Sequence, residues 1–596
     1  MPTWNKQQLA AITTKEKNIL VSASAGSGKT TVLVARLMDL VLKDHIAIDE
    51  ILAMTFTEAA ANEMKKRLAK ELQTAWQDSK DEAEKKFLSR QLSSLSNAYI
   101  STIHSFCLSI IQKYYYMIGL DHERVCSIMD NGAMTLYQQQ ALDEALQIQY
   151  QKHDEIFLTL CQMFSSRPED MESLSSMIMQ LATLASSKPD PDEWLDHLHD
   201  AYSGIKHIED LPVNIYHNFF EYLYVEEQRY EEALHHMDEI YRIKYPNEVK
   251  KIAVLETKLR ALSSIKEPIQ NQDYEGFRSA FIAICHGIVP TSPEKEDKEY
   301  ARVRKQINDM EDKLLSLLFR EEEFISDLNK LCPVIEKLVE ITKTYRKNYE
   351  AIKEKNKQID FDDMEHFALA ILDVNDHAVA DIYRQQFKQI MVDEFQDSND
   401  VQNALVMRIC TENNVFRVGD IKQSIYGFRH AKPQLMKGLI DHKGIHDEVI
   451  YLSNNYRSKE MIVEFNNELF KLLMNMDGFD CSYSAQDDVA TGVPAQKEDN
   501  VPICFHTIFH NEIKEANDLI LSKNDFKASY IANQILEIKE KEHRKWKDFV
   551  VLVRGNARKD DMKSVFDELN IPYFIDIKYG FYQSNAVQIM LSALQS

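Results

Sequence analysis

The chain has 596 residues, of which 44% are apolar and 28% are charged, a composition that suits large soluble cores and excludes a membrane-buried protein. At about 150 residues per domain, this length predicts roughly four folding units. The 70 basic and 94 acidic residues give a formal charge of −24, so bulk charge by itself argues against a nucleic-acid partner. A nucleic-acid role would have to rest on local motifs.

The 8 cysteines are scattered, without a C-x-x-C pair or a Cys/His cluster at metal-ligand spacing. This pattern predicts reduced thiols in apolar cores, with neither disulfides nor zinc. The first residues lack the basic and apolar segments of a secretory signal, and no apolar stretch is long enough to span a membrane. We therefore expect a cytoplasmic protein with no membrane partner.

Short apolar runs alternate with amphipathic segments at the start of the chain. Residues 18–23 and 51–57 predict strands, and the spacing of apolar residues over 30–42 predicts the helix between them, so we expect a parallel sheet. Residues 121–356 are typical of long amphipathic helices, with Pro333 as a disturbance, and their alternating charges favour solvated faces over specific recognition. Strand patterns return at 389–392, 415–418, 449–452 and 549–553. The sequence thus predicts an α/β domain split by a helical insertion.

The strongest motif is A-S-A-G-S-G-K-T-T over residues 23–31, placed between a predicted strand and a predicted helix. Gly26 and Gly28 let the loop curl so that backbone N–H groups and the helix N-terminus face phosphates. Lys29 supplies a positive charge and Thr30 a hydroxyl for Mg²⁺. We expect ATP-type phosphates to contact Ala23, Ser24, Ala25, Gly26, Ser27, Gly28, Lys29, Thr30 and Thr31.

An acidic pair follows the predicted strand at 389–392. Asp393 would bind Mg²⁺, together with Thr30, because this small hard cation prefers oxygen ligands. Glu394 would position and deprotonate the attacking water. An isolated Asp-Glu dipeptide in an acidic chain is usually a solvated surface pair without a function. Here the preceding apolar strand favours a role in binding metal and positioning water.

These motifs carry a family resemblance. D-E-F-Q-D at 393–397, V-G-D-I-K-Q-S-I-Y-G-F-R at 418–429 and N-N-Y-R-S at 454–458 resemble superfamily 1 helicases of the UvrD/RecB type. Within that group, A-S-A-G-S-G-K-T, T-F-T-E-A-A-A-N-E-M, I-S-T-I-H-S-F-C and I-D-F-D-D-M are similar to the AddA subunits of bacterial AddAB enzymes, which process double-strand breaks. The resemblance implies a RecA-like motor domain in two parts, 1–120 and 357–445, a helical insertion at 121–356, and an incomplete second RecA-like domain at 446–596.

The resemblance also implies roles for single residues. Gln8 matches a glutamine that reads the adenine edge, and Gln423 matches a residue that links the γ-phosphate to the DNA site. Arg457 matches an arginine that reaches the γ-phosphate and stabilises transition-state charge. An arginine beside such a turn could instead be an ordinary surface residue.

Residues that grip single-stranded DNA are implied at three places. Phe56 and Thr57 follow the second predicted strand, Thr102 and His104 lie in a second contact loop, and Tyr426, Phe428 and Arg429 follow Gln423. Aromatic faces stack on bases with little sequence preference, as a motor on DNA requires. The alternative is that Phe56 and Tyr426 are core residues and that His104 is a satisfied buried imidazole. Ile103 and Gly427 depart from the family pattern, where phenylalanine and arginine are usual.

The resemblance implies a helicase that uses ATP and Mg²⁺, binds single-stranded and duplex-end DNA, and pairs with an AddB-like subunit in a heterodimer. Relatives continue beyond the equivalent of Ser596 with further motifs and a nuclease domain, so we expect a truncated chain without nuclease activity. Two alternatives stay open. One is a stand-alone UvrD-like repair helicase, and the other is a DNA-binding module that does not hydrolyse ATP.

Overall fold

The computed structural model describes residues 4–164, 171–285, 290, 297–474, 483–492, 503–508, 523–555, 557–575, 587, 589–590 and 593. The chain divides into two compact units, Met1–Val501 and Pro502–Ser596, which are described separately. No helix in the described part of the chain is long and apolar enough to cross a membrane.

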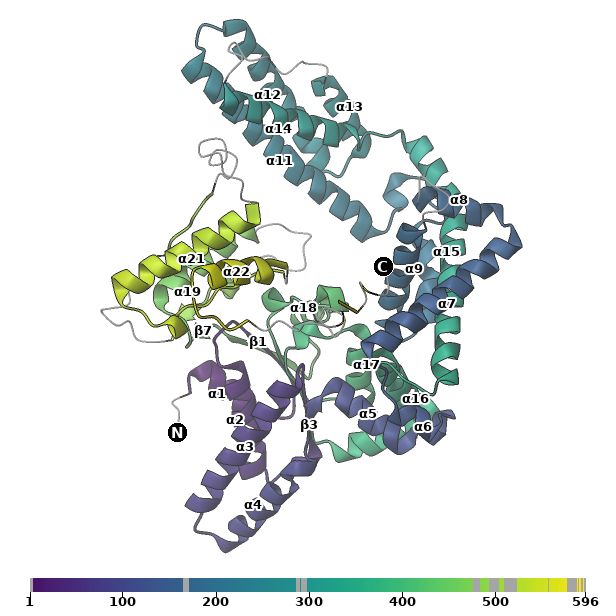
Figure 1. Ribbon diagram of the computed structural model, residues 1–596, viewed down its shortest axis with the longest axis vertical. Coiled ribbons are helices and arrows are strands. Elements are labelled where there is room, and N and C mark those ends of the chain that lie inside the picture. Colours follow the sequence, from purple (N-terminus) through teal and green to yellow (C-terminus); the bar gives the residue numbers. More distant parts are fainter. Residues whose placement is uncertain are drawn as a thin grey trace. The chain divides into compact units, whose positions relative to one another are not determined.

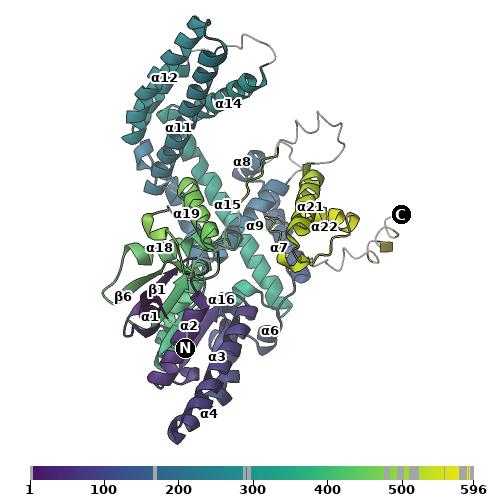
Figure 2. The same cartoon turned by 90° about the vertical axis from the view of Figure 1, so that its left-hand side faces the viewer.

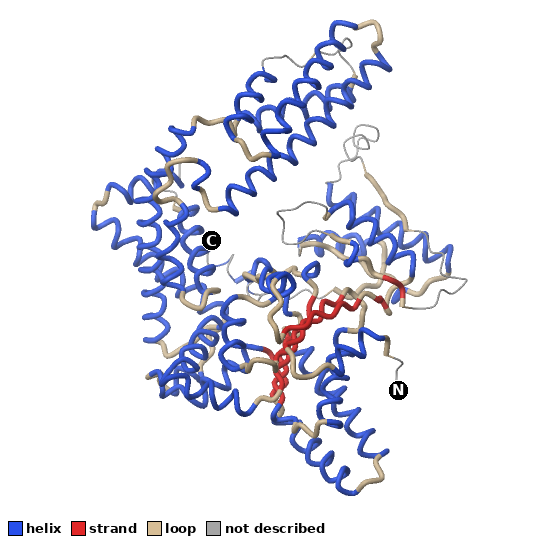
Figure 3. Tube along the Cα trace, turned by 180° about the vertical axis from the view of Figure 1, so that it is seen from behind, coloured by secondary structure: helices blue, strands red, loops and turns tan. Residues whose placement is uncertain are grey.

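Six parallel strands form the central sheet of the first unit, in the order β3-β2-β4-β5-β1-β6. Figure 3 shows them as a twisted red ribbon with helices on both sides. The four inner strands are mostly buried on both faces, as in parallel sheets generally, while the two edge strands, β3 and β6, are only partly buried. The strands are β1 (Asn18–Ala23), β2 (Ile51–Thr55), β3 (Tyr99–Thr102), β4 (Gln389–Val392), β5 (Val415–Gly419) and β6 (Asp447–Leu452).

Alternate residues of the strands enter two separate cores. In β1, Ile19 and Val21 pack into one core and Leu20 packs into the other, because successive side chains of a strand point to opposite faces. The first core lies under α1 (Lys6–Thr13), α2 (Lys29–Lys43), α3 (Glu58–Asp78) and α4 (Glu82–Ser94). The second lies under α5 (Ile103–Tyr114), α16 (Phe361–Gln386), α17 (Asp400–Ile409) and α18 (Gln434–Asp441). Residues 374–377 interrupt α16 with non-helical dihedral angles.

The segment between the two halves of the sheet is helical, as the sequence predicts. The long helix α15 (Glu321–Lys355) continues through Pro333 and packs against α7 (Asn131–Lys152), α8 (Glu155–Phe164), α9 (Glu172–Ser186) and α10 (Pro191–Asp196). A second bundle has its own core, and Figures 1 and 2 show it at the other end of α15 from α16. It contains α11 (Val213–Lys244), α12 (Val249–Gln270), α13 (Tyr274–Cys285) and α14 (Lys298–Leu315), while the short α6 (His122–Cys126) lies near α5.

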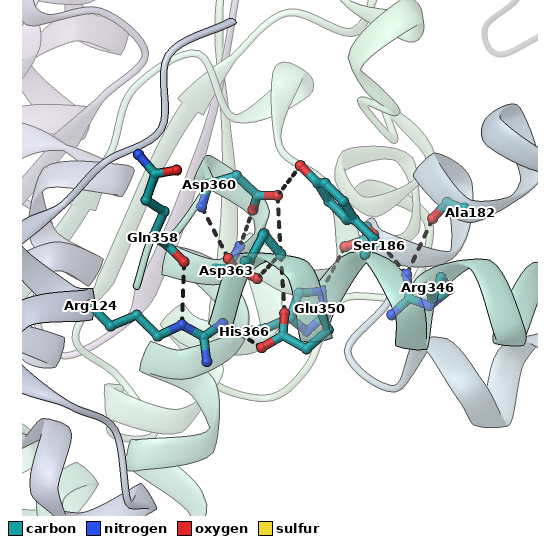
Figure 4. Close-up of polar contacts among 11 residues, drawn as sticks. Arg124, Ala182, Ser186, Arg346, Glu350, Gln358, Asp360, Asp363 and His366 are labelled. Atoms are coloured by element: carbon teal, nitrogen blue, oxygen red, sulfur yellow. Dashed lines mark hydrogen bonds and ion pairs between the residues drawn. The ribbon is translucent and has the colours of Figure 1, made fainter. Parts of the chain in front are cut away.

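Buried polar groups fasten the insertion to α16. The Lys353 ammonium at the end of α15 lies 3.1 Å from Asp360 and 2.5 Å from Asp363. Burial alone would lower the pKa of Lys353, but the two carboxylates outweigh it and raise that pKa. Figure 4 shows these aspartates near His366, which donates from Nε2 to the carbonyl oxygen of Ser186 at the end of α9, at 2.8 Å. The insertion is therefore tied to the sheet-bearing domain at its base.

The sheet continues past residue 446, where we expect the second motor domain to begin. β6 pairs in parallel with β1 along its whole length, from Asp447 opposite Asn18 to Leu452 opposite Ala23. This pairing covers the N–H and C=O groups that β1 would otherwise present as an edge strand. After β6 come β7 (Asn454–Asn455), α19 (Glu460–Leu473) and β8 (Ala490–Thr491), which still belong to the first unit.

The second unit has a small core between α21 (Lys523–Glu542) and α22 (Ala557–Glu568). The prediction of a strand at residues 549–553 is wrong, because this segment has no regular secondary structure. A strand is stable only with a hydrogen-bonded neighbour, and no strand among the described residues pairs with it. Phe549 and Val551 pack against the core of the two helices instead.

Candidate nucleotide site and nucleic-acid interface

The loop between β1 and α2 has the shape that a phosphate-binding loop needs. Gly26 and Gly28 take φ angles of +73° and +90°, in the left-handed region that favours glycine. Gly28 precedes the first turn of α2, whose N-terminus carries no side-chain cap. The Ser27 hydroxyl is buried without a hydrogen-bond partner. The N–H groups of the open helix end and the Ser27 hydroxyl can donate hydrogen bonds to an anionic phosphate. The loop therefore fits the nucleotide phosphates that the sequence predicts.

The acidic pair meets this loop although it lies far away in the sequence. The Lys29 ammonium lies 3.2 Å from Glu394 Oε2 and 3.2 Å from Gln423 Oε1. The carboxyl ends of β1, β5 and β4 are neighbours in the sheet, at about 4.8 Å per strand, so long side chains from these ends can converge. Glu394 has a φ of +49°, which is rare for a residue with a side chain and is typical of functional turns.

Asp393 directly follows β4 and is buried, while Thr30 lies half-buried in the first turn of α2. Burial and the neighbouring Glu394 raise the pKa of Asp393 to about 6. A divalent cation would favour the charged form of such a carboxylate, and carboxylate with hydroxyl oxygen is a donor set that Mg²⁺ accepts. These two residues therefore fit the predicted metal-binding role.

Gln396 and Asp420 connect the acidic pair to Gln423. The Gln396 amide donates to Glu394 Oε2 at 2.9 Å and accepts from the backbone N–H of Asp420 at 3.0 Å. Asp420 in turn accepts from the Gln423 amide at 2.7 Å. The orientation of Gln423 is thus fixed from both sides, by Lys29 and by Asp420.

Asn455 is a residue that the sequence analysis missed. Its amide donates to the carbonyl oxygen of Ala25 at 2.8 Å, and its Oδ1 accepts from the backbone N–H groups of Arg457 and Ser458 at 2.8 and 2.7 Å. A Cβ at Gly26 would lie 2.7 Å from the Asn455 amide, so the glycine is required for this approach as well as for its φ. One side chain thereby joins the phosphate loop to the turn that carries the predicted arginine.

For two predicted nucleotide-binding residues, Gln8 and Arg457, the structure supports the role less directly. Gln8 is buried, and its amide donates to the Ser27 carbonyl at 3.1 Å, so it contacts the loop rather than open space. The Arg457 side chain is exposed, and only its backbone is tied to the loop, through Asn455.

The predicted DNA-contact aromatics form a row at the carboxyl ends of the strands. The ring centroids of Phe56 and Tyr426 lie 4.4 Å apart, and those of Tyr426 and Phe428 lie 5.6 Å apart. The Arg429 guanidinium lies 5.8 Å from the Phe56 ring and 5.7 Å from the Tyr426 ring. Phe428 is 75% exposed, so it is not a core residue. The row offers aromatic faces and a cation, both suited to single-stranded nucleic acid.

The other predicted contacts have partners within the protein. Thr57 caps α3 by accepting from the Ala60 N–H, and the buried Thr102 donates to Glu58 at 2.9 Å. His104 Nε2 lies 3.2 Å from the buried Glu365 carboxylate, a partner that the sequence analysis did not identify. Phe56, His104, Glu394 and Arg429 nevertheless line one cavity, so the acidic pair and the aromatic row share a boundary.

Comparison with known families tests the assignment. Residues 4–443 match the UvrD/REP helicase N-terminal domain, and residues 450–596 match the UvrD-like helicase C-terminal domain. The chain belongs to the UvrD/REP helicase family. This confirms the resemblance noted in the sequence, and the parallel sheet with its helical insertion agrees with the expected helicase fold.

The chain is also similar to curated proteins that share one name. The A subunit of the ATP-dependent helicase/nuclease of Anoxybacillus flavithermus is 31% identical over 99% of this chain and 51% of that protein. Proteins of the same name from Staphylococcus haemolyticus and Bacillus anthracis are 30% identical over 100% and 99% of this chain, and over 50% of their own lengths. The chain spans about half the length of these curated relatives.

Proposed function

We propose that this chain is the motor part of an AddAB-type helicase-nuclease, which moves on single-stranded DNA by hydrolysing ATP with Mg²⁺. It would act in the cytoplasm on double-strand breaks, at duplex ends, with an AddB-like second subunit. The names of the curated relatives support this role, since they are ATP-dependent helicase/nuclease subunits. The residues flanking the insertion, 1–120 and 357–445, form the first motor domain in this proposal, and residues from 446 onward begin the second.

The single observation that carries the proposal is the meeting of Lys29, Glu394 and Gln423 at the end of the phosphate-binding loop. These residues come from three separate sequence motifs, and each has a charge or dipole suited to phosphoryl transfer. A structural ion pair would explain Lys29 and Glu394 alone. It would not explain an open helix end, a buried unpaired Ser27 hydroxyl and an acidic pair at the same place.

ATP with Mg²⁺ supplies the phosphoanhydride bond that is broken and the metal charge that stabilises the leaving oxygens. The loop amides and Lys29 hold the phosphates, while Thr30 and Asp393 hold the metal. Glu394 accepts the proton of the attacking water, and Arg457 approaches the γ-phosphate when the chain closes on nucleotide. Gln8 and Asn455 keep the loop in its curled form.

A short stretch of backbone connects the nucleotide site to the predicted DNA contacts. Gln423 contacts Lys29, and Tyr426 of the aromatic row lies only three residues further along the same segment. A displacement of Gln423 when the phosphate leaves would therefore be transmitted to Tyr426 by the backbone between them. The contact pair Phe56 and Tyr426 would shift with it, together with any base stacked there.

The test is the rate of ATP hydrolysis with and without single-stranded DNA. We expect strong stimulation by DNA, and a loss of about 10²-fold or more in turnover for Lys29→Ala and for Glu394→Gln. Glu394→Gln should still bind nucleotide, because it removes the base and keeps the phosphate loop intact. Lys86→Ala, an exposed lysine on α4, is the matched control and should behave as the unaltered chain.

The two alternatives are separated by the rate of ATP hydrolysis together with measurements of DNA binding and of unwinding. A DNA-binding module without turnover would bind single-stranded DNA in a salt-sensitive way and hydrolyse no ATP. A stand-alone helicase would unwind DNA at full rate without a second subunit. A rate of ATP hydrolysis that does not rise when DNA is added, or that is unchanged in Lys29→Ala, would contradict the proposal.

A further inference from the structure

An open groove runs between the helical insertion and the loop that ends the aromatic row. The helix α9 supplies one wall, with the exposed side chains of Met177, Gln180 and Thr183. Phe428 and His430 supply the other wall. The three α9 residues are spaced by three positions, so they lie on one face of the helix. That face lines the same pocket as Phe428, one of the predicted DNA contacts.

The aromatic row leads into this groove. Phe56 contacts Tyr426, Tyr426 contacts Phe428, and Phe428 lies at the mouth of the groove with its ring largely exposed. A nucleic-acid strand whose bases stack along these rings would continue between α9 and the 426–430 loop. Stacking of this kind is tolerant of sequence and follows the direction in which the rings are arranged.

The charge of the groove suits a polyanion. Of the described residues that line it, none is acidic, in a chain with 94 acidic residues. Lys188, just after α9, and Lys432, just after the loop, both pair with Asp400 at 2.8 and 2.9 Å. Two ammonium groups share one carboxylate, so this group of three side chains carries a net positive charge. Burial and then the charge of Lys188 lower the pKa of His430, which indicates that this field reaches the loop.

We propose that the outer face of α9 and the 426–430 loop form a further segment of the path of single-stranded DNA. Phe428 stacks on a base, while the Gln180 amide and the Thr183 hydroxyl exchange their bonds within α9, to Ser176 Oγ and to the Met179 carbonyl, for contacts to the sugar–phosphate backbone. Amide and hydroxyl side chains commonly make such contacts, which position a strand without reading its sequence. The inference rests on the proposed function, because it extends the binding surface of the same substrate. It assigns a DNA contact to the insertion, whose polar faces the sequence pattern alone attributes to solvent.

The experiment places negative charge on the groove wall and measures binding of a fluorescein-labelled thymidine oligonucleotide by anisotropy. The groove variant is Gln180→Glu with Thr183→Glu. Its matched control is Gln147→Glu with Gln151→Glu, which adds the same charge to an exposed face of α7. We expect the groove variant to lose about fivefold or more in affinity at low salt, and the control to change by less than about twofold. The added carboxylates repel nearby phosphates, so the difference in affinity between the groove variant and the unaltered chain should shrink as the salt concentration rises.

A second groove variant, Phe428→Ala, and a reference variant outside the groove, Phe56→Ala, distinguish failure of the groove inference from failure of the proposed function. Phe428→Ala removes one exposed ring, and we expect it to weaken DNA binding without lowering the unfolding temperature. If the unaltered chain binds DNA and Phe56→Ala weakens binding, but the groove variant and Phe428→Ala bind normally, the groove inference is wrong and the proposed function stands. That result would also be expected if a protein segment, rather than DNA, occupied the groove. If the unaltered chain does not bind single-stranded DNA, both proposals fail.

Discussion

At the scale of single residues, Asn455 shows what local sequence patterns do not reveal. Its partner Ala25 lies 430 positions away along the chain. The motif around Asn455 predicts a role for Arg457, because a positive charge can bind a phosphate. An amide side chain can donate to or accept from many groups, so its residue type does not predict its partner. Lys29, Gly26 and Asp393 could be identified because their residue types, after predicted strands, have few other uses. The partners of Asn455 depend on how three segments meet, and that arrangement comes from the tertiary fold.

We expect Asn455→Ala to reduce catalysis more than nucleotide affinity. The change leaves the Ala25 carbonyl and two backbone N–H groups without their partner, a loss of about 1–3 kcal/mol in stability. It also frees the turn that carries Arg457, so the turnover number of DNA-stimulated hydrolysis should fall while the KM for ATP changes less. The measurement is steady-state kinetics beside Asn466→Ala, an exposed asparagine on α19. A lower unfolding temperature with an unchanged turnover number would assign Asn455 a purely structural role.

At the scale of elements, buried strands were the most predictable part of the fold. The runs at 18–23 and 389–392 match β1 and β4 at both ends, because a strand buried on both faces is a continuous apolar run bounded by polar residues. The strand β3 was missed since it has only four residues and ends in Ser101 and Thr102. The segment at 549–553 shows the opposite case, a strand-like run with which no strand among the described residues pairs. Strand formation depends on a partner that the local sequence does not contain.

The contact between α9, α17 and the 426–432 loop gives a pH-dependent prediction. Asp400, at the start of α17, joins Lys188 to Lys432. Burial would raise the pKa of Asp400, but hydrogen bonds from the two lysines outweigh it and lower that pKa. A carboxyl group with a lowered pKa in the folded state stabilises the fold above its unfolded pKa of about 3.9, and this stabilisation is lost as the pH falls below that value.

We therefore expect Asp400→Asn to lower the free energy of unfolding near neutral pH by about 2 kcal/mol. The difference from the unaltered chain should shrink as the pH falls below about 4, where the carboxylate of the unaltered chain is itself protonated. Thermal unfolding at several pH values measures this. Asp373→Asn, which breaks an exposed pair with Arg408, is the control and should cost less than about 1 kcal/mol. An Asp400→Asn effect that does not change with pH would mean that the pairing charge is unimportant.

At the scale of the whole molecule, the predicted functional residues converge because the sheet is parallel. Thr102 is the last residue of β3, and Phe56, Asp393 and Asp420 directly follow β2, β4 and β5, so one edge of the sheet collects all four. A net charge of −24 does not conflict with the proposed DNA contacts, because the proposed surface is a local arrangement of rings with the Arg429 guanidinium. Motif order predicted this convergence, while the position of β6 and the extent of the first unit depended on pairings that only the folded chain contains.

The division of the chain into two units leads to a test of what nucleotide binding requires. All proposed nucleotide residues, from Gln8 to Arg457, lie in the unit Met1–Val501, and the core of α21 and α22 is separate from the cores under the sheet. We expect a fragment of residues 1–501 to fold and to bind a fluorescent ATP analogue within about threefold of the affinity of the full chain. Lys29→Ala should weaken binding equally in both forms, which serves as the control for the site. Circular dichroism would establish that the fragment is folded. A folded fragment that fails to bind the analogue would show that residues beyond 501 supply contacts that the phosphate loop, the acidic pair and Asn455 cannot replace.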